Sequence, residues 1–212
     1  MYHLAKLGAL RSASGGAAAA TPPVFERVGD IAFGPSNPDV TFPDDVFTDE
    51  IALLLVFSVN TSSASGFTEI GNISGAGGKL YIFWKRCSGS EGATDVTVTS
   101  SHFTYGQIVM FSGCITSGTP YEDFEIDTDT STTASAPNLT TTNSGRLGVA
   151  GYTGTAMTGT SPASGWTEQL GDANVFLLDT KDILTATTET GIDRSISSSE
   201  WFAYSLALLP AA

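Results

Sequence analysis

The segment from Ile51 to Val59, IALLLVFSV, constrains the fold of this chain more than any other feature. It is nine residues long and uncharged, with Asp49 and Glu50 before it and a polar turn at residues 60–63 after it. A buried helix would usually run longer, whereas this length suits a strand in a protein interior. The segment therefore predicts a β-strand that is buried on both faces.

Short apolar or alternating segments follow one another along the rest of the chain, separated by residues that favour turns. This rhythm, with 23 glycines among 212 residues, is typical of many short strands joined by tight turns. The sequence therefore predicts an all-β protein, with residues 134–145 as a long polar loop. The other expected strands are residues 24–25, 31–33, 40–42, 66–73, 79–85, 95–99, 107–115, 147–153, 165–170, 175–178, 183–188, 192–196 and 201–209.

The formal charge of −13 argues against a nucleic-acid partner, because binding phosphates requires clustered cations. No apolar run has the length of a membrane span. The N-terminal residues also lack the continuous apolar stretch of a secretory signal, so we expect no targeting segment. Cys87 and Cys114 are the two cysteines of the chain. We expect them to be reduced, buried thiols, with a single disulfide as the alternative.

Two stretches of the chain repeat a short motif in the same setting. SASGFTEIG at residues 63–71 matches SPASGWTEQLG at residues 161–171 around Ser-Gly-aromatic-Thr-Glu. Each copy follows an apolar strand and precedes an aromatic-bearing one, and a terminal apolar strand comes later in each half. This shared order predicts an internal repeat, with residues 51–115 and 147–209 as its copies.

The motif places a large aromatic residue after a glycine in each copy, Phe67 in the first and Trp166 in the second. The glycine allows a sharp turn, and the ring would then close the end of a sheet. Two antiparallel sheets from such a chain would pack as a sandwich. We expect Trp166 to be a core residue, because its counterpart is apolar. Its place beside a loop also makes it the candidate for stacking on a sugar ring.

An apolar strand, a loop with Ser-Gly-aromatic-Thr, a strand such as KLYIFWK, and then VTVTSS and QIVMFSG form an order that resembles the jelly-roll domains of phage virion proteins. The likeness covers roughly residues 40–209. It implies an antiparallel β-sandwich of jelly-roll type and a structural or adhesive role, with no catalytic residues and no cofactor. It further implies assembly as a homotrimer and contact with the major capsid or tail protein.

Within that class we expect a capsid decoration or cement protein, assembled in the host cytoplasm and located in the virion. Fibre proteins usually carry long repetitive shafts, and this chain has none. A tail-fibre protein or a lectin-like, carbohydrate-binding adhesin is the alternative, and a glycoside hydrolase is a more distant one.

Residues 1–23 are expected to form an extended N-terminal arm ahead of a β-sandwich domain at residues 24–212. The stretch SASGGAAAATPP cannot bury enough apolar surface to offset the entropy of ordering it. We therefore expect a partner surface to hold the arm, with folding back onto its own domain as the alternative. The arm residues expected to contact a partner are Leu4, Lys6, Leu7, Leu10 and Arg11.

An acidic run at residues 125–129 is the first candidate for chemistry. Alternation along a strand places Glu125, Asp127 and Asp129 on one side. The run is similar to the acidic strand motif of laminarinase-like glycoside hydrolases, although the third position is Asp where that family has Glu. Its carboxylates are also weak calcium candidates. We favour a solvated acidic edge that prevents sheets from associating, and we expect His102 to lie in an exposed loop.

Overall fold

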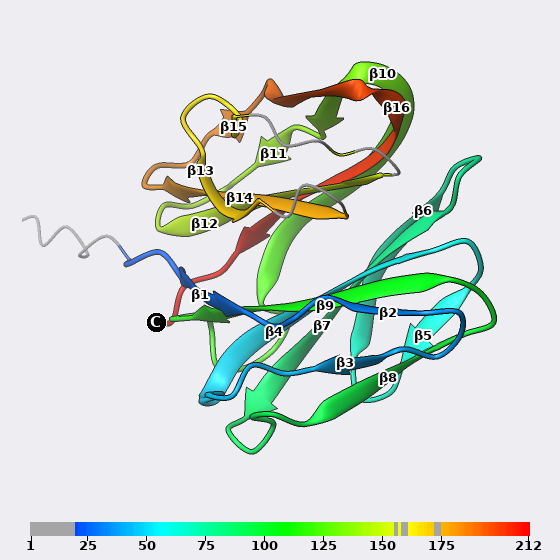
Figure 1. The fold of residues 1–212 in the computed structure, drawn as a ribbon. Coiled ribbons are helices and arrows are strands. Elements are labelled where there is room, and N and C mark those ends of the chain that lie inside the picture. Colours follow the sequence, from blue (N-terminus) through cyan, green and yellow to red (C-terminus); the bar gives the residue numbers. More distant parts are fainter. Residues whose placement is uncertain (1–19, 155–156, 158–160, 172–174) are drawn as a thin grey trace, which may run out of the picture.

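The computed structural model describes residues 20–154, 157, 161–171 and 175–212. In this part of the chain the regular elements are β-strands, and neighbouring strands pair antiparallel, so the all-β prediction is confirmed (Figure 1). The same residues contain no helix that is long and apolar enough to cross a membrane.

Residues 24–112, the first half, form a large sheet and a smaller sheet that covers its outer face. Their strands are β1 (Val24–Val28), β2 (Ala32–Gly34), β3 (Asp39–Thr41), β4 (Thr48–Ser58), β5 (Ser62–Ala64), β6 (Thr68–Ser74), β7 (Lys79–Ser88), β8 (Asp95–Ser100) and β9 (Thr104–Ser112). The large sheet has the order β1–β9–β4–β7–β6, and β2 pairs with the other end of β9. The small sheet has the order β3–β8–β5.

Residues 121–208, the second half, repeat this arrangement. Their strands are β10 (Tyr121–Ala136), β11 (Leu139–Thr140), β12 (Arg146–Gly154), β13 (Thr167–Gly171), β14 (Phe176–Ile183), β15 (Thr188–Glu189) and β16 (Ile192–Leu208). The large sheet has the order β10–β16–β12–β14–β13, and β11 and β15 form the small sheet.

The four sheets stack as layers, with the two large sheets in the middle and one small sheet on each outside (Figure 1). A central core lies between the large sheets and contains, for example, Leu53 and Val109 of the first half with Val149 and Leu206 of the second. An outer core lies beneath each small sheet. The two-sheet sandwich expected from the sequence is therefore the middle of a four-layered body.

Strand β4 confirms the prediction of a strand buried on both faces. Its odd-numbered side chains, from Ile51 to Phe57, belong to the central core, and its even-numbered side chains, from Ala52 to Val56, belong to the first outer core. Residues 51–56 are at most 1% exposed. The strand is apolar throughout because it lies between β7 and β9 in its sheet and between two further sheets in the stack.

Corresponding strands occupy corresponding positions in the two large sheets. In each half the central strand, β4 or β12, lies between the last strand, β9 or β16, and the second strand of a hairpin, β7 or β14. The first strand of the hairpin, β6 or β13, forms one edge. The segments in which the sequence motif recurs therefore have the same place in both sheets.

The repeated motif also forms the same turn twice. Gly66 and Gly165 have φ angles of 79° and 80°, in the left-handed region that glycine adopts without strain. The next residue, Phe67 or Trp166, donates its backbone N–H to the carbonyl three residues earlier, at 3.4 Å in the first half and 2.9 Å in the second. A β-bulge begins three residues after each glycine. These shared details make the two halves structural copies of one pattern.

The second half departs from the expected strand boundaries. Strand β10 continues to residue 136, where a polar loop was expected from residue 134, and β16 joins the two strands expected at 192–196 and 201–209. The long strands pair with each other along most of their length. The loop prediction failed because β10 is an edge strand rich in Thr and Ser, and it contributes only the small side chains of Ala134 and Ala136 to the second outer core.

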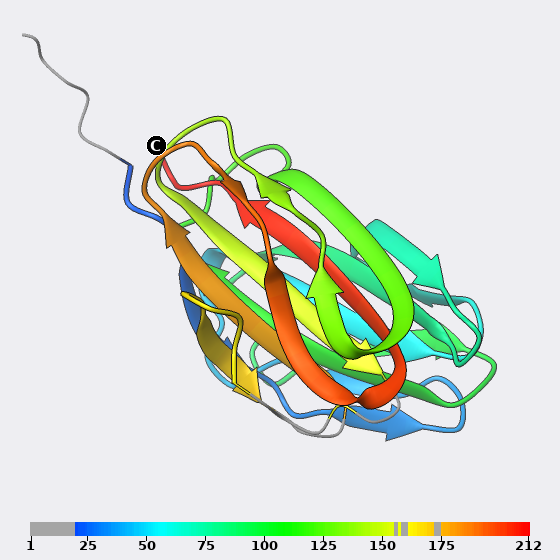
Figure 2. The ribbon, with the colours of Figure 1, turned by 90° about the horizontal axis from the view of Figure 1, so that it is seen from above.

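The two ends of the described chain lie together. Ala211 donates its backbone N–H to the carbonyl of Gly113 at 2.7 Å, and Pro23 approaches the same glycine. Ala20 lies against Gly145 in the turn before β12. Figure 2 shows the start of the described chain and the C-terminus at one end of the body.

Candidate functional surfaces

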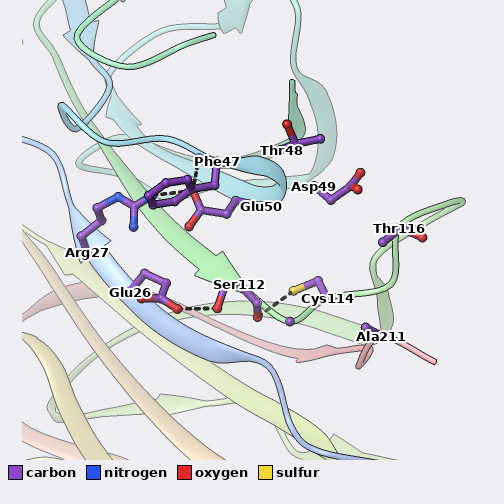
Figure 3. Close-up of a pocket in the computed structure, with 11 residues that line it drawn as sticks. Glu26, Arg27, Phe47, Thr48, Asp49, Glu50, Ser112, Cys114, Thr116 and Ala211 are labelled. Carbon is purple, nitrogen blue, oxygen red and sulfur yellow. Dashed lines mark hydrogen bonds and ion pairs between the residues drawn. The ribbon is translucent and has the colours of Figure 1, made fainter. Parts of the chain in front are cut away.

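A hollow of about 390 Å³ lies where β1 passes the start of β4 (Figure 3). Arg27 of β1 forms an ion pair with Glu50 of β4, and its guanidinium carbon lies 5.4 Å from the centroid of the Phe47 ring. Glu50 also accepts a hydrogen bond from the backbone N–H of Phe47 at 2.8 Å. The Glu50 side chain is only 5% exposed, and Arg27 neutralises its buried charge. Through these contacts Arg27, Phe47 and Glu50 attach the loop before β4 to the edge strand β1.

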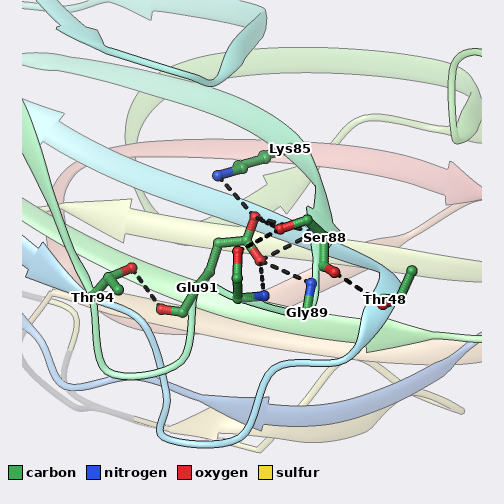
Figure 4. A network of polar contacts seen from close by, with 7 residues as sticks. Thr48, Lys85, Ser88, Gly89, Glu91 and Thr94 are labelled. Carbon is green, nitrogen blue, oxygen red and sulfur yellow. Dashed lines mark hydrogen bonds and ion pairs between the residues drawn. The ribbon is translucent and has the colours of Figure 1, made fainter.

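Glu91 organises the turn after β7 (Figure 4). Its carboxylate accepts hydrogen bonds from the N–H groups of Ser88, Gly89 and Ser90, each at 3.1 Å, and pairs with Lys85 at 3.1 Å. Burial alone would raise the pKa of this carboxyl, but the hydrogen bonds from Ser88 and the contact with Lys85 outweigh burial and lower it to about 2. The contacts of this carboxylate therefore stabilise the turn after β7.

An ion pair is enclosed in the second outer core. The side chains of Arg194 and Asp179 are both 0% exposed, and Arg194 Nε donates to Asp179 Oδ2 at 2.9 Å. Arg194 also donates to Glu168 at 2.9 Å. Burial would lower the pKa of Arg194, but the contacts with Asp179 and Glu168 outweigh burial and raise it. Asp179 pairs with Glu168 as Phe83 pairs with Glu69, so it occupies the position of an apolar core residue in the first half.

Aromatic side chains gather in a group, here called the aromatic patch. It consists of the exposed Phe33 of β2, the exposed His102 and Phe103 just before β9, and the partly buried Tyr105 of β9. The rings of Phe33 and Phe103 are nearly parallel, at 3°, with centroids 5.8 Å apart. Phe33 also stacks on Tyr105 at 4.5 Å. Phe33 and Phe103 are 55% and 53% exposed, although both are fully apolar.

A shallow hollow of about 530 Å³, here called the hydroxyl hollow, lies at the same end of the first half. Its lining consists of Ser, Thr and Asn residues, among them Asn37, Thr61, Ser63, Thr99 and Ser101. The turn at residues 34–37 and the turn at residues 100–103 run from the hollow to the aromatic patch. Hydrogen bonds fix these turns, since Ser100 N–H donates to Asn37 Oδ1 at 2.8 Å and Asn60 Nδ2 donates to Ser101 Oγ at 3.1 Å.

Trp166, the sequence-based candidate for stacking on a sugar ring, is buried. Trp166 is 7% exposed and belongs to the second outer core, as its core assignment predicted. It therefore offers no open ring face to a sugar. Phe67 packs against the first outer core and stacks on Phe42 at 6.0 Å. His102 lies in an exposed turn, as predicted.

The acidic candidates lie on the outer face of β10. Glu125, Asp127 and Asp129 are all exposed, as alternation along a strand requires. Among the residues that the structure describes, no three His, Cys, Asp or Glu side chains gather closely enough to hold a metal ion. The spacing of the carboxylates along an exposed edge strand is that of a solvated acidic border.

The remaining predicted residues divide into two groups. Cys87 and Cys114 are both free and buried, as expected, and burial is the main cause that raises the pKa of each thiol to about 12. The predicted partner contacts of the arm, Leu4, Lys6, Leu7, Leu10 and Arg11, lie outside the described residues.

Sequence reasoning missed Phe33 and Phe103. Both lie beside a turn, before Gly-Pro in one case and after Ser-Ser-His in the other. A large apolar residue next to a turn is a signal for exposure. It is weak, because Phe42 and Phe67 also lie beside turns and are covered by the first half.

Comparison with known proteins adds no relative. No protein family, curated protein or solved structure matches the chain. Its function must therefore be argued from the fold and its surfaces.

Proposed function

We propose that this chain is a non-enzymatic structural protein of a phage virion, a decoration or cement protein that residues 1–23 attach to the major capsid or tail protein. The observation that carries the proposal is the position of the chain ends. Residues 20–23 and the C-terminus lie at one end of the body (Figure 2). An anchor that precedes residue 20 would hold the body by that end and leave the opposite end free.

The strand order supports the jelly-roll resemblance. Numbered within the first half, with β1 and β2 as one strand, the strands follow the order 1-8-3-6 in the large sheet and 2-7-4 in the small one. A jelly roll has this order, except that here the fifth strand extends the large sheet. The second half has no described strand at the fourth position. With that position left vacant, its strands follow 1-8-3-6 in the large sheet and 2-7 in the small one, and the fifth strand again extends the large sheet. We propose that the protein is a tandem of two jelly rolls packed through their large sheets.

The polar clusters also favour a structural role. Each of the three ionic groups described above, around Glu50, Glu91 and Asp179, has a basic partner and helps to hold an element of the fold. A general acid or base needs a titratable group that a substrate can reach. The acidic face of β10 would keep neighbouring copies on a crowded particle from pairing edge to edge.

The test compares the full chain with a variant that lacks residues 1–23, by sedimentation with purified virus particles. A second test variant keeps the arm but carries Leu4→Ala, Leu7→Ala and Leu10→Ala. We expect the full chain to sediment with particles, the deletion variant to remain in the supernatant while folded, and the triple variant to bind more weakly. Equal sedimentation of all three, or none by the full chain, would overturn the proposal.

A further inference from the structure

The aromatic patch leaves an apolar surface open to water at the end opposite the chain ends. Strand β2 pairs with residues 104–106 of β9, whereas β1 pairs with residues 109–112 near the C-terminus. Phe33 and Phe103 are each more than half exposed, and their nearly parallel rings stack on each other. Apolar side chains that gather on a surface favour burial against a ligand or a partner.

The surroundings of the patch restrict the chemistry of what it binds. The hydroxyl hollow, joined to the patch by two turns, is lined by hydroxyl and amide groups and contains no charged lining residue. Ser101, which lines the hollow, and Phe103 of the patch are two residues apart, so their backbones lie at most about 7 Å from each other. Hydroxyl and amide groups both donate and accept hydrogen bonds, as the hydroxyl groups of a sugar do.

We propose that the aromatic patch and the hydroxyl hollow together bind a neutral oligosaccharide. The C–H groups of one sugar ring pack against the exposed parts of Phe33 and Phe103, and the hydroxyl groups of the next unit exchange hydrogen bonds with the hollow. The uncharged lining suits a neutral sugar, and the overall charge of −13 disfavours an acidic one. The site differs from the one expected at Trp166, which is buried.

A second copy of the chain is the competing occupant of the patch. An interface between copies requires a larger, well-packed apolar area than a few rings, whereas a sugar site needs a small aromatic surface with polar groups beside it. The few aromatic rings beside a polar hollow match the description of a sugar site. The patch lies at the end of the body opposite the proposed anchor, so binding of a sugar can be measured on the isolated full-length chain.

The experiment is a screen of the full chain on an array of neutral oligosaccharides built from hexose and N-acetylhexosamine units, followed by calorimetric titration of each hit. Phe33→Ala and Phe103→Ala test the patch, and Thr99→Val tests the hollow. Phe47→Ala is the matched control, because Phe47 is 62% exposed but lies beside the Arg27 guanidinium. Circular dichroism confirms that each variant is folded.

We expect each patch variant to weaken binding about tenfold, the hollow variant to weaken it less, and the control to bind as the parent chain does. Three outcomes would overturn the proposal. The array yields no bound oligosaccharide, the patch variants bind as well as the control, or sedimentation shows that the parent chain self-associates and that Phe33→Ala dissociates it. The last outcome would assign the patch to an interface between copies.

Discussion

The enclosed ion pair of Arg194 and Asp179 gives the sharpest prediction about what holds the second half together. Both side chains are 0% exposed, and each is the main charge partner of the other. Replacing Arg194 by Met leaves the Asp179 carboxylate buried without its cation. Loss of one member of a buried pair costs about 3–5 kcal/mol of the free energy of unfolding. Asp179→Leu should cost a similar amount or somewhat less, because the buried guanidinium loses its buried charge partner and keeps the partly exposed Glu168.

The double variant Asp179→Leu, Arg194→Met should recover most of this loss. The first half holds Phe83 at the position of Asp179, so an apolar side chain is compatible with this place in the fold. Replacing a buried pair by apolar residues of similar volume is often neutral or stabilising. Some loss should remain, about 1–2 kcal/mol, because the backbone N–H of Ala163 donates to Asp179 at 3.2 Å and would lose its acceptor.

Urea unfolding followed by far-UV circular dichroism at neutral pH measures these differences. Each single variant should also lower the melting temperature by about 6–20 °C, given about 2–4 °C per kcal/mol for a chain of this size. Lys181→Met is the control, because its pair with Glu189 is partly exposed, at 30% and 17%, and should contribute under about 1 kcal/mol. The buried pair does not have this role if the double variant has as low a free energy of unfolding as the single variants, or if the single variants are as stable as Lys181→Met.

Three further predictions concern other parts of the molecule. Because Glu91 has a pKa of about 2 in the folded chain, below its usual 4.5, its contribution to stability is present above pH 4.5 and is lost as the pH falls through about 2. Glu91→Gln should therefore destabilise the protein by about 2–3 kcal/mol at pH 7 and by almost nothing near pH 2, measured by urea unfolding at both values. Cys87 and Cys114 should resist a thiol reagent at pH 8 until the chain is unfolded, because burial raises each thiol pKa to about 12, and rapid labelling of the native protein would contradict this. Gly66→Ala and Gly165→Ala should each cost about 1–2 kcal/mol, because both glycines have left-handed φ angles with open space around them, and unequal costs would mean that the two turns are not equivalent.

The features that could be predicted from the sequence are those that depend on residues close together along the chain. The buried strand β4 could be recognised because its residues 51–57 are seven consecutive apolar residues, and the turn at Gly66 and Gly165 could be recognised because its requirements lie within a few residues. The outer sheets could be recognised only in part, since the strands expected at residues 40–42 and 95–99 correspond to β3 and β8. Strands such as β5, β11 and β15 are two or three residues long and depend on pairing with strands that are distant along the chain.

The candidate surfaces were less predictable than the fold. Exposure of Phe33 and Phe103 depends on how far the second large sheet extends over the first, and no local pattern encodes that distance. The acidic run of β10 was placed correctly on an exposed face, because alternation along a strand is a local property. A surface formed by turns from different parts of the chain becomes visible only when the strands between them are in register.

The divergence between the two halves follows from compensation across strands. In the central core Leu55 lies opposite Gln107, whereas at the corresponding pair of positions Gly151 lies opposite Tyr204. The Tyr204 ring occupies the space where a side chain of Gly151 would begin, with its Cε1 atom 2.1 Å from that position. The volume that Leu55 of the central strand fills in the first half is thus filled in the second half by Tyr204 of the neighbouring strand.

The same exchange explains why only one short motif of the repeat survives in the sequence. Core positions need a filled volume, and two strands that are far apart along the chain can share it in different ways. The turn has no such freedom, because its glycine must adopt a left-handed conformation and the next residue must cover the end of a core. A repeat of this kind therefore persists in the sequence where the constraint is local and disappears where the constraint is shared between strands.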